Sequence, residues 1–146
     1  MKKKVAFICI HNSCRSQMAE GYMKKFGSDV AEAYSAGTET YHEVKQKAVE
    51  AMKLDGIDIS MQYPKLLADI PGKLDILITM GCGVTCPQVP CDYRADWGLE
   101  DPSGGPIEDF IKTRELIRER ILGLIEDIKN DNLEYMKETG TIHLAL

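Results

Sequence analysis

The chain has 146 residues, of which 44% are hydrophobic and 28% are charged. This length and balance are ordinary for one soluble globular domain with a buried core. The formal net charge of −5 argues against a general nucleic-acid-binding surface and against an anionic membrane surface. The basic and apolar start is too short for a secretory signal, because polar residues follow from His11 onward. We therefore expect a cytoplasmic protein, whose five cysteines favour catalytic, redox or metal-binding roles over a structural disulfide framework.

The apolar pattern alternates between strands and helices along the chain. Strands are predicted over residues 5–9, 31–35 and 74–80. Helical spacing predicts three helices. The first ends near Gly27, the second ends near Gly56, and the third spans residues 107–128. This βαβ alternation implies a doubly wound parallel sheet, with its ligand site at the carboxyl ends of the strands. The loops that follow the three strands should therefore converge on one site.

The most informative segment follows the first strand and reads Cys9-Ile10-His11-Asn12-Ser13-Cys14-Arg15-Ser16. We predict that these residues form an oxyanion-binding loop, in which backbone N–H groups and a helix start surround a tetrahedral anion. The same groups favour the thiolate of Cys9, which is the nucleophilic form of the side chain. The planar guanidinium of Arg15 matches two oxygens of phosphate or arsenate. Cys9 and Arg15 are therefore the first two catalytic candidates.

Residues 81–91 form a second notable segment, because they hold Cys82, Cys86 and Cys91 among glycines and prolines. A disulfide relay is the interpretation that we favour, and it requires a resolving thiol that can approach Cys9 closely. The alternatives are small residues that fill gaps under a loop, and a soft-metal site. The spacing differs from that of a zinc knuckle and no fourth ligand is nearby, so we predict no metal.

The loop from Cys9 to Ser16, continued by Gln17-Met18-Ala19-Glu20, resembles the signature of the low-molecular-weight protein tyrosine phosphatase family. The continuation is similar to the thioredoxin-coupled arsenate reductase branch of that family. The resemblance implies a three-layer α/β fold with a doubly wound, four-stranded parallel sheet, in a single domain over residues 1–129. Residues 130–146 are left as a C-terminal extension of unknown role.

This resemblance also implies a catalytic role for Asp101. An Asp-Pro pair such as Asp101-Pro102 is by itself a common turn signal. In the family, an Asp-Pro loop at this place in the chain carries the general acid, which later activates water as a base. Asp101 is therefore included among the catalytic candidates.

The activity implied by the resemblance is the reduction of arsenate to arsenite. Cys9 would form a thiol-arsenate adduct, and Cys82 would resolve it as a Cys9–Cys82 disulfide. Cys86 would then take over to give a Cys82–Cys86 disulfide, although Cys91 is a rival for this second role. Thioredoxin is the expected electron donor, and no bound cofactor is expected. We also expect arsenate as substrate with phosphate or sulfate as analogues, a monomeric state, and a role in arsenical resistance.

Two other functions stay open at this point. A low-molecular-weight protein tyrosine phosphatase would hydrolyse phosphate monoesters, with Asp101 activating the water that attacks phosphocysteine. The chain lacks the aromatic residues that the phosphatase branch has after its Asp-Pro pair, because Pro102 is followed by Ser103. The third hypothesis is a non-catalytic arsenite-binding or soft-metal-binding module that uses the thiols of residues 81–91.

Three residues, Asn12, Ser16 and Ser35, are expected to brace the loop and fix its N–H groups. Some reductases of this family hold a potassium ion near the loop. Asn12, Glu20 and Ser35 match three of its ligands, but the acidic fourth position corresponds to Lys65. Because the ammonium of a lysine could replace the cation, we predict no bound metal.

We make separate predictions for two further residues of the loop, His11 and Cys14. His11 stands where many family members have glycine, and histidine tolerates a positive φ better than most residues. We expect its side chain to face solvent at the rim. Cys14 is expected to be a spectator that packs under the start of the helix.

Overall fold

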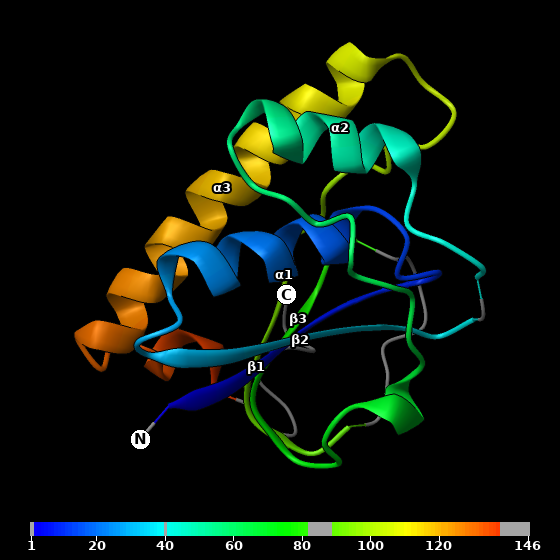
Figure 1. Ribbon diagram of the computed structural model, residues 1–146. Helices are drawn as coiled ribbons and strands as arrows, with labels where there is room; N and C mark the ends of the chain where they lie inside the picture. Colours follow the sequence, from blue (N-terminus) through cyan, green and yellow to red (C-terminus); the bar gives the residue numbers. More distant parts are fainter. Residues whose placement is uncertain (1, 40, 82–88, 138–146) are drawn as a thin grey trace.

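The computed structural model describes residues 2–39, 41–81 and 89–137 of the chain (Figure 1). Its centre is a sheet of four parallel strands in the order β2-β1-β3-β4. The strands are β1 (Lys3–Cys9), β2 (Ala31–Gly37), β3 (Leu74–Thr79) and β4 (Cys91–Asp96). The register of β1 and β2 runs from Lys3↔Ala31 to Cys9↔Gly37. The loops that follow β1 and β2 therefore leave the sheet at the same edge, and the predicted fold class is confirmed.

Three helices cover one face of this sheet, as Figure 1 shows. They are α1 (Arg15–Phe26), α2 (Gln46–Leu54) and α3 (Ile107–Lys129). The first helix lies between the sheet and the other two, so every residue from Arg15 to Met23 is buried. The opposite face carries a thinner layer built around the short helix η1 (Leu67–Asp69), where Ile70 packs on the sheet residues Ala6 and Leu77. Within the described ranges, no helix is long and apolar enough to cross a membrane.

The predicted strands and helices are present because their apolar residues are the buried ones. The last five residues of β1 are all buried, as a strand covered on both faces requires. On α3, a stripe at helical spacing is buried by at least 96%: Phe110, Ile117, Ile121 and Leu124. The helical spacing of apolar residues predicts that Val44 belongs to the second helix, but this helix begins at Gln46, so Val44 lies before its start.

The fourth strand, β4, is the one that the apolar pattern did not locate. It lies at the edge of the sheet and alternates charged residues, Asp92, Arg94 and Asp96, with less polar ones. An edge strand is covered less completely than a central one, so its sequence lacks a continuous apolar run. Cys91, which we expected in a thiol-rich loop, is instead the first residue of this strand.

The chain continues to pack on the sheet beyond the end of α3. The short helix η2 (Glu134–Met136) follows it. The side chains of Leu133 and Met136 are only 1% and 4% exposed and belong to the main core. Lys137 then forms a single antiparallel bridge with Tyr93 of β4. The boundary at residue 129 stays a prediction, and we propose that the folded unit extends at least to Met136.

Candidate active site

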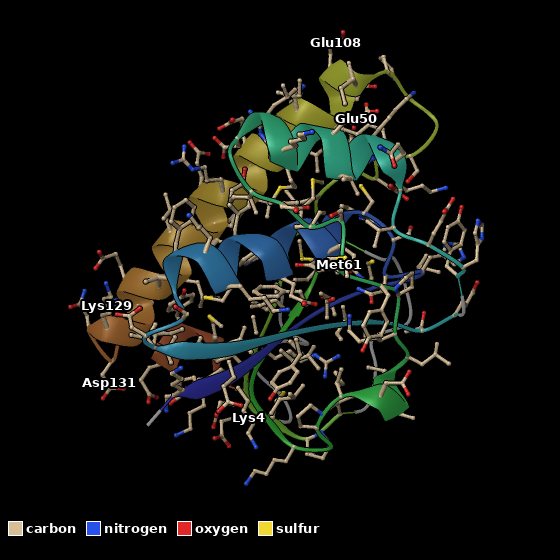
Figure 2. The ribbon with its side chains drawn as sticks, in the orientation of Figure 1. Lys4, Glu50, Met61, Glu108, Lys129 and Asp131 are labelled. Atoms are coloured by element: carbon tan, nitrogen blue, oxygen red, sulfur yellow. The ribbon has the colours of Figure 1, made fainter. Side chains whose placement is uncertain are left out.

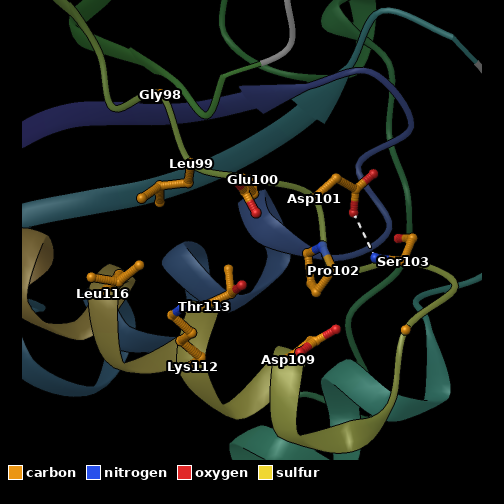
Figure 3. A pocket seen from close by; sticks show the side chains of 11 residues that line it. Gly98, Leu99, Glu100, Asp101, Pro102, Ser103, Asp109, Lys112, Thr113 and Leu116 are labelled. Atoms are coloured by element: carbon orange, nitrogen blue, oxygen red, sulfur yellow. Dashed lines mark hydrogen bonds between the residues drawn. The ribbon is translucent and has the colours of Figure 1, made fainter.

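Three segments meet at the carboxyl edge of the sheet and line an open cavity of about 570 Å³. They are the loop after β1, the residues after β3 and the segment after β4. The cavity is lined by Ile10, Arg15, Gly81, Asp96, Gly98, Leu99, Glu100 and Asp101. A second cavity of about 490 Å³ lies on the other side of residues 98–105, against α3 (Figure 3). No residue of the loop after β1 lines the second cavity, so we place the chemistry in the first.

The loop that follows Cys9 surrounds its sulfur, and the whole residue is only 4% exposed. The amide of Asn12 donates to Cys9 Sγ at 3.2 Å, and Ser16 Oγ lies 2.8 Å from the same sulfur. The side-chain Nδ2 of Asn12 donates to Ser16 Oγ at 2.8 Å. Because this hydroxyl already accepts one hydrogen bond, its own proton can be donated to a thiolate. The geometry suits a charged nucleophile at Cys9.

Arg15 begins α1 and connects the three segments of the site. Its Nη1 donates to Met80 O and to Leu99 O, each at 2.7 Å. Its Nη2 lies 3.8 Å from Asp101 Oδ2. The Arg15 side chain is 94% buried, and these contacts set the orientation of its guanidinium. Arg15 therefore holds a positive charge beside the loop and also fixes the backbone after β3 and β4.

Asp101 lines the same cavity as Arg15. Burial raises the pKa of its carboxyl group, but the hydrogen bonds from Ser103 and the charges of Arg15 and Lys45 outweigh burial and hold the pKa below its usual range. One of these bonds joins Ser103 N to Asp101 Oδ1 at 3.0 Å and is the dashed line in Figure 3. The carboxyl group is therefore ionised at neutral pH, the form that accepts a proton.

Asn12 is the point where the loop turns. Its φ of 55° lies in the left-handed region, which asparagine tolerates better than most residues. Its Oδ1 accepts hydrogen bonds from Lys65 N and Gln17 Nε2, each at 2.9 Å. The positive φ of the loop is therefore at Asn12 and not at His11, and the Asn12 side chain fixes the turn through its own hydrogen bonds.

The backbone after β2 also holds the loop in place. Thr38 N donates to Cys9 O at 3.2 Å, and Glu39 N donates to Ile10 O at 2.9 Å. Gly37 lies so close that a Cβ at this position would be 2.6 Å from Ile10 O. Only glycine fits between the end of β2 and the loop, and this is a brace that the sequence pattern did not reveal.

The hydroxyl of Ser35 makes its hydrogen bond to Glu20, and the bracing role of Ser35 stays a prediction. Its hydroxyl donates to Oε1 of Glu20, which is 3% exposed and also pairs with Lys24. Lys65 Nζ lies 3.5 Å from the same Glu20 Oε1. Burial lowers the pKa of Lys65, and the nearby Glu20 carboxylate only partly offsets this effect. Any bracing of the loop by Ser35 is therefore indirect and passes through the ion pair of Glu20 with Lys65.

Two other residues of the loop, Cys14 and His11, differ in their exposure to solvent. Cys14 is 3% exposed, and burial, with smaller contributions from Asp101 and Cys9, raises the pKa of its thiol well above the usual range. It therefore stays an uncharged thiol at neutral pH. His11 is 44% exposed at the side-chain level, with its Nε2 3.3 Å from Glu39 Oε1. Its ring packs near that of Tyr41 at the rim, with 5.2 Å between the ring centroids.

The structure does not describe two of the predicted catalytic residues, Cys82 and Cys86, because they lie outside the described ranges. The residue before them, Gly81, is firmly held. Its N donates to Asp96 Oδ1 at 2.9 Å, and a Cβ there would lie 2.8 Å from the backbone of Leu99. Among the described residues, no group of three or more His, Cys, Asp or Glu side chains is arranged to hold a metal ion.

Some residues around the site were not predicted from the sequence. Gln17 follows the loop directly and is fully buried. The sequence signal that could have indicated it is a polar amide placed immediately after the loop, at the start of the helix. Lys45 N donates to Ser13 O at 2.7 Å, and Lys45 Nζ donates to Tyr41 Oη at 2.6 Å. The contact of Lys45 with Ser13 joins segments that are far apart in the chain, and no local pattern indicates it.

Comparisons with known proteins agree with this geometry. The family model of low molecular weight phosphotyrosine protein phosphatase matches residues 4–134. An arsenate reductase of Staphylococcus aureus (strain Newman) is 44% identical over 121 residues, covering 80% of this chain and 92% of that protein. A solved structure of an arsenate reductase in the phosphate binding state is 40% identical, with a TM-score of 0.80, and the match covers 88% of this chain and 99% of the other.

A second solved structure extends the comparison. It is a thioredoxin-dependent arsenate reductase from Corynebacterium glutamicum, 31% identical with a TM-score of 0.73. The match covers 89% of this chain and 63% of that chain. Because the family model spans nearly the whole chain and the fold and loop agree with it, the chain belongs to the low molecular weight phosphotyrosine protein phosphatase family.

Proposed function

We propose that this protein is an arsenate reductase that acts through the thiol of Cys9. The observation that carries the proposal is the loop geometry, in which Ser16 Oγ and the amide of Asn12 contact the Cys9 sulfur at 2.8 and 3.2 Å beside Arg15. An arsenate reductase relative that is 44% identical supports arsenate as the substrate. We further propose a cytoplasmic monomer that serves arsenical resistance, with phosphate and sulfate as analogues at the same loop.

The first chemical step forms a bond between Cys9 sulfur and arsenic. The thiolate attacks the arsenic atom of arsenate, and one arsenate oxygen leaves as water after it takes up protons. The N–H groups of residues 10–16 and the guanidinium of Arg15 stabilise the remaining oxygens of the adduct. The ionised carboxylate of Asp101 lines the same cavity, where it can hold a proton that passes between solvent and the departing oxygen.

The second step transfers two electrons to arsenic. A Cys82 thiolate attacks the sulfur of Cys9, a Cys9–Cys82 disulfide forms, and the electron pair of the S–As bond reduces arsenic from As(V) to As(III). Arsenite leaves with this pair. Cys86 then attacks Cys82, which releases the Cys9 thiolate and leaves a Cys82–Cys86 disulfide. A thioredoxin dithiol reduces this disulfide, as the thioredoxin-dependent relative from Corynebacterium glutamicum suggests.

The test is arsenate-dependent oxidation of NADPH in the presence of thioredoxin and thioredoxin reductase, with an aryl phosphate hydrolysis assay run beside it. We expect turnover in the wild type and none in Cys82→Ser or Cys86→Ser, with hydrolysis unchanged by these substitutions. Cys91→Ser is the matched control, because Cys91 lies in β4, and it should keep its turnover. Loss in Cys91→Ser but not in Cys86→Ser would reassign the second resolving thiol. Brisk hydrolysis without any arsenate turnover would identify a phosphatase instead.

A further inference from the structure

Four side chains form a continuous line of hydrogen bonds that leads from a half-buried position to the nucleophile. Gln62 Nε2 donates to Gln17 Oε1 at 2.7 Å, and Gln17 Nε2 donates to Asn12 Oδ1 at 2.9 Å. Asn12 Nδ2 donates to Ser16 Oγ at 2.8 Å, and this hydroxyl lies 2.8 Å from Cys9 Sγ. The three inner members are fully buried. We call this line the amide relay.

The orientation of the Asn12 amide is set by a backbone group. Lys65 N, which can only donate, lies 2.9 Å from Asn12 Oδ1. This atom must therefore be the oxygen, and the NH₂ group must face Ser16. Since Ser16 Oγ accepts this bond, its hydroxyl proton is directed at Cys9 when Cys9 carries a negative charge. A thiolate cannot donate, so the last bond of the relay has only one possible direction.

The two glutamines are oriented in the same way. Gln17 Nε2 lies 2.9 Å from Tyr63 O and 2.9 Å from Asn12 O, which are carbonyl oxygens that can only accept. This atom must therefore be the nitrogen. Gln62 Nε2 lies 3.0 Å from Gln17 O, which again can only accept. The Gln17 and Asn12 amides therefore each receive a hydrogen bond on their oxygen, and all three amides of the relay donate from their nitrogen toward the sulfur.

We propose that Gln17 and Gln62 are positioning residues that stabilise the charged form of Cys9 through this relay. Each donated bond polarises the next amide, and such chains strengthen one another in a buried site. The final bond is made to a charged sulfur, where hydrogen bonds are strongest. The inference deepens the proposed function, on which it depends only in treating Cys9 as the nucleophile.

Gln62 offers the sharpest test because it is the outermost member and only half-buried. In Gln62→Glu, a carboxylate replaces the donor next to Gln17 Oε1, so the Gln17 amide loses the hydrogen bond on its oxygen and faces a negative charge at this end. Gln62→Met removes the bond without reversing it. Met61→Glu is the matched control, since it adds the same charge one residue away on a side chain that is 89% exposed (Figure 2).

The measurement is the rate of Cys9 alkylation by iodoacetamide as a function of pH, followed by tandem mass spectrometry of the peptide that holds Cys9 and Cys14. The midpoint of this profile reports the thiolate directly and needs no arsenate. The charged groups around the loop, which include Arg15, Asp101, Lys45 and the pair of Glu20 with Lys65, are unchanged in every variant. Any shift in the midpoint can then be assigned to the substituted side chain.

The relay predicts an ordered result. The midpoint should rise by a few tenths of a pH unit in Gln62→Met and by about one unit in Gln62→Glu, with little change in Met61→Glu. Gln17→Met should also raise it, and the Gln62 variants decide the outcome if this buried substitution prevents folding. Profiles that match the wild type in both Gln62 variants would overturn the proposal, as would an equal shift in Met61→Glu. A wild-type enzyme without arsenate turnover would overturn the proposed function but not this result.

Discussion

Replacing Gly37 by alanine should displace the anion-binding loop without altering any of its side chains. A Cβ at this position would lie 2.6 Å from Ile10 O, 2.9 Å from His11 C and 3.0 Å from Asn12 N. Ordinary contact begins at 3.4 Å, so the nearest atom must retreat by about 0.8 Å. All three atoms belong to the backbone, which cannot move aside as a flexible side chain can.

The size of the effect follows from this displacement. Overpacking of a well-packed site typically costs about 1–3 kcal/mol, which is less than the roughly 5–15 kcal/mol that stabilises a folded domain. A misplacement of about 1 Å at reacting groups can lower a rate by roughly 100-fold. We therefore expect Gly37→Ala to fold, to bind phosphate at least tenfold more weakly, and to lose roughly 30- to 100-fold in kcat/KM for arsenate.

Phosphate affinity is measured by calorimetry, arsenate turnover by the thioredoxin-coupled assay, and the free energy of unfolding by urea titration. The matched control is Gly123→Ala on α3, where an added Cβ has no neighbour within 4 Å. This control should gain about 0.5–1 kcal/mol of stability from helix propensity and keep its activity. Wild-type phosphate affinity and turnover in Gly37→Ala would refute the reasoning.

Three further predictions concern the core and the site. Leu133→Ala, at a position that is 1% exposed, should lower the free energy of unfolding by about 2–5 kcal/mol in urea titration; an unchanged value would exclude residue 133 from the folded unit. Arg15→Lys should weaken phosphate binding at least about tenfold by calorimetry, because an ammonium lacks the planar fork; equal affinity would contradict this. The folded pKa of Asp101 lies below its ordinary value of 3.8, so its stabilisation relative to Asp101→Asn should be fully present above that pH. This stabilisation should be lost as the pH falls through the folded pKa. Urea titrations of the wild type and Asp101→Asn between acidic and neutral pH would measure it. A stability difference that stays constant over this range would show that the pKa is not lowered.

The segment from Cys9 to Ser16 could be interpreted from the sequence because its chemistry is local. An anion loop needs consecutive backbone N–H groups, a thiol at its start and a helix at its end, and all of these lie within a short stretch of chain. The buried run of β1 and the apolar stripe of α3 are local in the same sense, because strand and helix periodicities repeat within a few residues. The family resemblance also depends on this contiguous segment.

The partners that hold the loop were decided only by the tertiary structure. Arg15 Nη1 bonds to carbonyl groups 65 and 84 residues away in the chain, and backbone groups such as these can be supplied by any residue type. Gln62 and Lys65 reach the loop from a connection whose path depends on how the helices pack on the sheet. Edge strand β4 likewise lacks the apolar run that marks a central strand. A sequence determines which groups can bond, but their meeting depends on packing between segments that are distant in the chain.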